Sequence, residues 1–98
     1  MFLHIIAVNY VTHYTLLVIF NNGVRKQVNL QHELDGEIFE PLKNIERFKQ
    51  VRVNPETKTI EWPNGADLAP EFLYEIGQID QEREEKMSSD PTMQPVLA

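Results

Sequence analysis

Apolar and polar residues alternate along the first third of the chain in a pattern that predicts two paired β-strands. Residues 14–20 and 24–30 are rich in β-branched and aromatic residues and flank an Asn-Asn-Gly turn at 21–23. A two-residue loop would mix apolar with polar side chains on both faces of the hairpin. A three-residue loop with its glycine in the left-handed conformation instead gives one apolar face. The pairs expected on that face are Phe20–Val24, Leu16–Val28 and Tyr14–Leu30.

The same register leaves Leu17 and Ile19 on the opposite face of the hairpin. A small monomer rarely leaves two such apolar side chains on an open sheet surface. We therefore expect this face to be covered by a helix or to contact another molecule, including a second copy of the chain.

A second hairpin is predicted at residues 50–54 and 59–62. Pairing Val53 with Ile60 collects apolar side chains on one face, and this face belongs to the core. The charged residues expected on the solvent side are Arg52 and Glu61.

Helical spacing of apolar residues occurs in two places, and each begins with a proline suited to the first helical position. The predicted helices cover residues 41–48 and 70–76, and the second pattern allows continuation past Gly77. The apolar residues 3–9 predict a further strand. The expected fold is α+β, with a small antiparallel sheet from two β-hairpins plus an N-terminal strand, packed with two short helices. Phe48 and Trp62 are expected in the core.

Composition changes towards the C-terminus. Residues 79–98 carry five acidic against two basic residues, a charge of −3, together with two prolines and no apolar period. We expect a single domain over residues 1–77. Residues 78–98 are expected to form an acidic, partly disordered tail, helical at most to about Met87 and ordered by contact with a basic partner.

The overall composition excludes several functions. Nine basic and fifteen acidic residues give a net charge of −6, which opposes direct binding of nucleic acid. The absence of cysteine excludes a disulfide scaffold, thiolate chemistry and cysteine-based zinc sites. No apolar run approaches the roughly 20 residues that span a bilayer, and the N-terminus lacks the features of a secretion signal. We expect a cytoplasmic protein that does not contact a membrane.

Residues that could carry chemistry are few. The three histidines do not have the spacing that places two imidazoles on one helix face, and no phosphate-binding glycine loop is present. The string His32-Glu33-x-Asp35 offers three side chains to a metal, without other support in the sequence. No catalytic residue, metal or cofactor is assigned.

The segment Trp62-Pro63-Asn64-Gly65-Ala66-Asp67 combines a strand end with a turn. Asn64 and Gly65 tolerate positive φ, and Asp67 can accept hydrogen bonds from backbone amides ahead of the second helix. Loops carry binding functions more often than strands do. The candidate partner or ligand contacts are therefore Asn64, Gly65, Asp67, Leu17 and Ile19.

Three strings of the sequence are typical of one family: Leu16-x-Val18-x-Phe20-Asn21-Asn22-Gly23, Phe39-x-Pro41-Leu42 and the string that begins at Trp62. In these, residues 3–76 resemble the small bacterial domain of unknown function 2442 family. The resemblance implies an α+β fold on antiparallel strands and no assigned activity. Members look like short stand-alone proteins, often beside a second small open reading frame in a toxin–antitoxin-like arrangement. Some carry an appended helix-turn-helix, for which the residues after Ile76 are too few and too acidic.

Two classes of function follow. The favoured one is a non-enzymatic protein-interaction module whose partner is another small protein, basic if the pair is toxin–antitoxin-like; a homodimer is a further option. The alternative is a small metal- or ligand-binding enzyme that uses His32, Glu33, Asp35 and Asp67.

Overall fold

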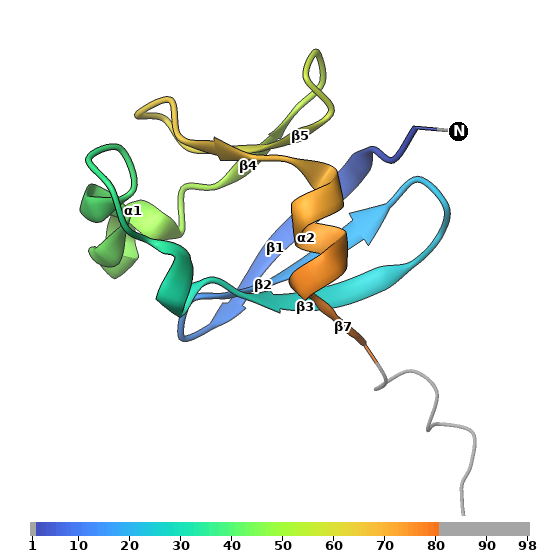
Figure 1. The fold of residues 1–98 in the computed structure, drawn as a ribbon, viewed down its shortest axis with the longest axis horizontal. Coiled ribbons are helices and arrows are strands. Elements are labelled where there is room, and N and C mark those ends of the chain that lie inside the picture. The colour runs from blue at the N-terminus through green and yellow to red at the C-terminus, as the bar shows by residue number, and fades with distance from the viewer. Residues whose placement is uncertain (1, 81–98) are drawn as a thin grey trace, which may run out of the picture.

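The computed structural model describes residues 2–80, which fold into two antiparallel sheets and short helices (Figure 1). The predicted α+β class is confirmed. One sheet is expected from the sequence, whereas the strands divide between two. The expectations for the C-terminal tail beyond Asp80, including its helical limit near Met87, concern residues that lie outside the described part of the chain.

The larger sheet has four strands in the order β1-β2-β3-β7. These are β1 (Ile5–Thr12), β2 (Thr15–Phe20), β3 (Arg25–Asn29) and β7 (Gln78–Ile79). The smaller sheet has the order β4-β5-β6. Its strands are β4 (Arg52–Asn54), β5 (Thr59–Glu61) and β6 (Asp67–Leu68).

The first hairpin has the expected three-residue loop. Leu16 pairs with Val28, and the Phe20 N–H donates to the Val24 carbonyl at 2.9 Å. Gly23 adopts φ of 87°, in the left-handed region where a side chain is disfavoured. The predicted register is therefore confirmed, and Leu17 lies on the face opposite the core.

The second hairpin also has the predicted register. Val53 pairs with Ile60, while the charged pair on the solvent side closes a salt bridge of 2.6 Å between Arg52 and Glu61. Asn54 supports the turn, because its side-chain oxygen accepts the Glu56 N–H at 2.8 Å.

The first of the two predicted helices is divided into two shorter segments. Residues 41–48 divide into a 3₁₀ turn (Glu40–Lys43) and α1 (Ile45–Phe48), and a further 3₁₀ turn covers Gln31–Glu33. Asn44 separates the two segments: its backbone is extended, with ψ of 117°, and its side chain accepts the Glu46 N–H at 2.9 Å. Asparagine is favoured at this position because it satisfies an amide that the first helical turn leaves free.

The second helix, α2 (Pro70–Ile76), has the predicted bounds, but the continuation past Gly77 is wrong. The chain instead turns into β7, which pairs with β3 through Lys26 and Gln27. Figure 1 shows α2 leading from the smaller sheet to the edge of the larger one. Gly77 permits this approach, because a Cβ there would lie 2.9 Å from a Val28 methyl carbon.

The N-terminal strand covers Ile5–Thr12 rather than 3–9, and its pairing with β2 is irregular at two points. The register shifts between Ile5 and Ala7 and between Tyr10 and Thr12, which marks β-bulges. The extra residues at these bulges, Ile6 and Val11, are both exposed.

One core joins both sheets and both helices. Phe48 and Trp62 are buried as predicted, at 0% and 1% exposure. The other fully buried large side chains come from both sheets, α2 and the segments after β3, and are Phe20, Leu16, Leu30, Leu34, Leu42, Ile60, Leu73, Val18 and Val28.

Candidate functional site

The turn after β5 is fixed by Asn64. The Gly65 N–H donates to the Trp62 carbonyl at 2.9 Å, and Gly65 has φ of 94°. The side-chain oxygen of Asn64 accepts the Ala66 N–H at 3.1 Å, and its amide nitrogen donates to the Ile38 carbonyl at 2.9 Å. Asn64 therefore shapes its own turn and ties it to a segment 26 residues away.

Asp67 does not have the role that the sequence predicts. It lies in β6 opposite Glu61, with its side chain exposed, and it accepts no backbone hydrogen bond within residues 2–80. Asn64 accepts the local amide instead, because its short side chain reaches the N–H two residues ahead in an Asx turn.

The segment that Asn64 contacts is acidic. Residues 33–40, here called the acidic segment, carry four exposed carboxylates, on Glu33, Asp35, Glu37 and Glu40. Only Glu40 forms an ion pair with a described residue, Lys43, at 3.3 Å. The other three carboxylates are therefore available to an external cation, as far as residues 2–80 show.

Ile38 is the exposed apolar residue of this segment, with 46% of its surface accessible. A Cβ built on Gly65 would lie 3.9 Å from the Ile38 Cδ1 atom, so the turn backs directly onto this side chain. The structure thus brings Asn64 and Gly65 together with Ile38, which the sequence analysis missed. The sequence pattern carried no signal of this contact, because Ile38 has the spacing to Leu42 and Ile45 of one face of the predicted helix.

Leu17 and Ile19 lie on a second surface, the outer face of the larger sheet. Both are half-buried, and neither helix covers them, because Phe48 of α1 and Leu73 of α2 pack into the core on the other side. The pairing registers define this outer face, and its members are Ala7, Asn9, Thr12, Thr15, Leu17, Ile19, Arg25, Gln27, Asn29, Gln78 and Asp80.

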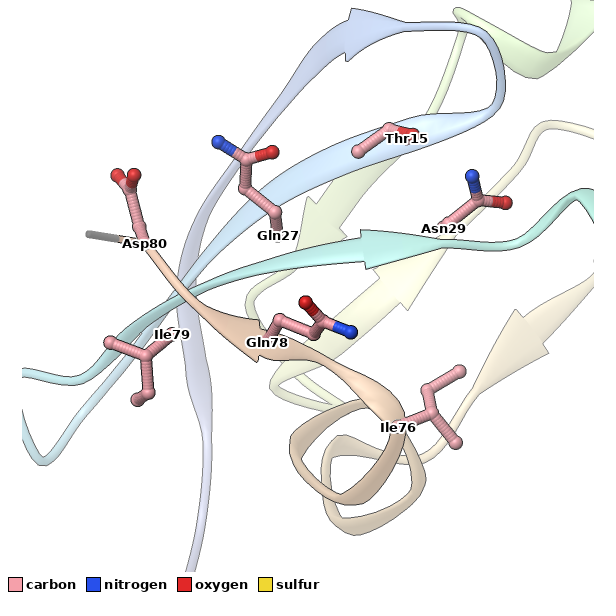
Figure 2. Close-up of a pocket in the computed structure, with 7 residues that line it drawn as sticks. All are labelled: Thr15, Gln27, Asn29, Ile76, Gln78, Ile79 and Asp80. Carbon is pink, nitrogen blue, oxygen red and sulfur yellow. The ribbon is translucent and has the colours of Figure 1, made fainter. Parts of the chain in front are cut away.

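A groove of about 480 Å³ opens at the β3 and β7 end of the outer face. Figure 2 shows Thr15, Gln27 and Gln78 around it, with Ile76 at the end of α2. At its far end the buried carboxylate of Asp80 pairs with Arg25 at 3.4 Å. The groove went unrecognised in the sequence analysis, although Gln78-Ile79-Asp80 has the alternation of a strand.

The residues considered for an enzyme are distributed over different elements. His32 and Glu33 lie in an exposed 3₁₀ turn, Asp35 follows it, and Asp67 lies in β6. Among the residues that the structure describes, no group of three or more histidine, aspartate or glutamate side chains is placed to hold a metal ion.

Comparison with known protein families matches residues 5–78, about three quarters of the chain, to the proteins of unknown function designated DUF2442. The chain belongs to this family. The DUF2442 assignment confirms the resemblance found in the strings around Phe20 and Trp62. No curated protein and no solved structure matches the chain significantly. Within residues 2–80 of this DUF2442 member, no helix has the length and apolar character needed to cross a membrane.

Proposed function

We propose that this DUF2442 protein is a non-enzymatic interaction module that binds a small basic protein, as the acidic member of a toxin–antitoxin-like pair. The observation that carries the proposal is the exposed side chain of Ile38, held by the Asn64 turn within the acidic segment.

The arrangement suits a basic protein partner for two reasons. An exposed apolar side chain within a polar surround resembles the anchor of a protein interface, where central contacts supply most of the binding energy. The carboxylates of Glu33, Asp35 and Glu37, which form no ion pair within residues 2–80, favour approach of a positively charged surface and raise the association rate.

The turn also prepares the surface for binding. Asn64 bonds to the backbone of Ile38, so the segment is held before a partner arrives. A preformed surface loses less conformational entropy on association than a flexible one. Asn64 and Gly65 are thus proposed as supports of the contact, with Ile38 as its anchor.

The test is affinity capture of the tagged full-length chain from its own cell extract, followed by binding measurements with the captured protein. We expect a stoichiometric small basic protein, retained by the wild type and bound at least tenfold more weakly by Ile38→Ser. The control is Ile79→Ser, since Ile79 is comparably exposed at 51% but lies in β7.

A charge comparison tests the role of the acidic segment. Joint neutralisation of Glu33, Asp35 and Glu37 by Gln, Asn and Gln should slow association and reduce its dependence on salt. Equal neutralisation of the exposed Glu56, Glu71 and Glu75 should have a smaller effect. Equal binding by Ile38→Ser and wild type, or capture of no stoichiometric basic protein, would contradict the proposal.

A further inference from the structure

We propose that the outer face of the larger sheet packs against the same face of a second copy of this chain. The proposal does not depend on the acidic segment, which lies on other elements. It rests on three properties of this face within residues 2–80: its charge, the order of its residues across the strands, and the groove at its β3 and β7 end.

The outer face is almost free of net charge. Of its eleven positions only Arg25 and Asp80 are charged, and they pair with each other at 3.4 Å. The solvent side of the smaller sheet differs, because Arg52, Glu61 and Asp67 lie on its three strands.

This distribution favours a second copy over a basic partner. Each chain carries a net charge of −6, so two copies repel each other wherever their acidic surfaces meet. An uncharged face is the surface on which that repulsion is smallest, whereas a basic partner gains no electrostatic attraction there. Charged residues are also depleted at the centre of protein–protein interfaces.

The order of residues across the face fits a two-fold interface. Leu17 and Ile19 lie on β2, which has β1 on one side and β3 on the other. Amide side chains flank them, with Asn9 on β1 and Gln27 on β3. An axis passing near Leu17 would bring the apolar strands of the two copies together and place the amides at the rim, as in a self-complementary contact.

The groove in Figure 2 supplies an independent observation. Its volume of about 480 Å³ is lined partly by the amides of Gln27 and Gln78. Neither amide side chain has a hydrogen-bond partner among residues 2–80. Side chains of a second copy would occupy this space and offer these amides partners, in a sheet-on-sheet packing about 10 Å thick.

Sedimentation equilibrium of the full-length chain tests the proposal. We expect reversible dimers of the 11.4 kDa chain. Leu17→Asp and Ile19→Asp should each raise the dimer dissociation constant at least tenfold, because they place like charges across the interface. Circular dichroism identifies variants that fail to fold, and Gln27→Glu, at the polar rim, provides a milder version of the same test.

Mixing variants with opposite charges at Leu17 tests whether this residue of one copy lies near the same residue of the other. Leu17→Asp mixed with Leu17→Lys should form heterodimers more tightly than either variant forms homodimers. Ile38→Asp, on the acidic segment, should leave the dissociation constant unchanged. Leu17→Asp should in turn leave capture of a basic protein intact, so the two proposals fail separately.

Two results would overturn the inference. The first is that sedimentation shows only monomer at every concentration up to several hundred micromolar. This result overturns the inference also where amide exchange shows that residues 81–98 cover the outer face. The other is a dimer whose dissociation constant is unchanged by both Leu17→Asp and Ile19→Asp.

Discussion

The indole N–H of Trp62 donates a hydrogen bond of 2.9 Å to the backbone carbonyl of Phe48, and both side chains are buried. Their rings are tilted, with centroids 5.7 Å apart. The Phe48 ring also meets Tyr10 and Tyr14 edge to face, at centroid distances of 6.0 Å and 5.1 Å. The Trp62–Phe48 pair therefore links the end of β5 to the larger sheet through α1.

Truncation of Trp62 to alanine should destabilise the protein by about 3–5 kcal/mol, because it leaves a cavity between the sheets and removes the hydrogen bond. Trp62→Phe retains an aromatic ring but deprives the buried Phe48 carbonyl of its donor, which should cost about 1–3 kcal/mol. Urea denaturation followed by circular dichroism measures both values. Equal unfolding midpoints for the wild type and Trp62→Ala would contradict the prediction.

Gly77→Ala should destabilise the junction of α2 and β7. A Cβ at this position would lie 2.9 Å from both the Leu73 carbonyl oxygen and a Val28 methyl carbon, and such overpacking costs about 1–3 kcal/mol. Displacement of β7 should also speed amide exchange of Asp80, whose N–H donates to the Arg25 carbonyl at 3.0 Å.

Gly23→Ala is the matched control for this variant. Gly23 has φ of 87° and no atom within 4 Å of a built Cβ, so its substitution costs backbone strain, about 1–2 kcal/mol, without a clash. After correction for the change in global stability, the amide exchange rate of Asp80 in Gly23→Ala should stay close to that of the wild type. Similar acceleration in both variants would argue against a local effect at Gly77.

Glu61 should make stability depend on pH on the acid side. Hydrogen bonds from Asn54 and Arg52 hold the pKa of Glu61 below its ordinary value of 4.5. A carboxyl whose pKa is lowered by folding stabilises the protein above its unfolded-state pKa, and this contribution disappears as the pH falls through the folded-state pKa. The stability difference between wild type and Glu61→Gln should therefore be full at pH 7 and shrink below about pH 4.5.

Denaturant unfolding at a series of pH values measures this difference. Glu56→Gln is the control, because Glu56 is exposed and forms no ion pair with a described residue. A difference for Glu61→Gln that stays constant from neutral to strongly acidic pH would show that the lowered pKa does not contribute.

Two substitutions of Asn64 separate its two hydrogen bonds. Asn64→Asp keeps an acceptor for the Ala66 N–H but loses the donor to the Ile38 carbonyl, whereas Asn64→Ala loses both. At about 0.5–1.5 kcal/mol for each bond, the alanine variant should be roughly twice as destabilised as the aspartate variant. Thermal or chemical unfolding gives the order, and an aspartate variant as stable as the wild type would contradict it.

The candidate site was partly predictable from the sequence. The Asn64-Gly65 pair favours a turn through local backbone preferences alone, and the turn is present. The role given to Asp67 was wrong because Asp67 lies in β6 opposite Glu61, and the residue directly before α2 is Ala69. The contact of the Asn64 turn with Ile38 could not be predicted, since the two residues are 26 positions apart in the sequence.

The sequence by itself determined the two hairpins and the bounds of α2. Side-chain alternation and turn residues set the pairing of Leu16 with Val28 and of Val53 with Ile60, and the proline at 70 set the start of α2. These features act over a few residues, so a local pattern is sufficient to specify them.

Only the tertiary structure decided how the elements combine. The division into two sheets, the pairing of β7 with β3 and the bond from Asn64 to Ile38 join segments that are distant in the sequence. Such contacts depend on which strand edges and backbone groups remain free once the core around Phe48 and Trp62 has formed. Edge strands can pair with any compatible segment, and the closure of the core, rather than their own periodicity, selects the partner.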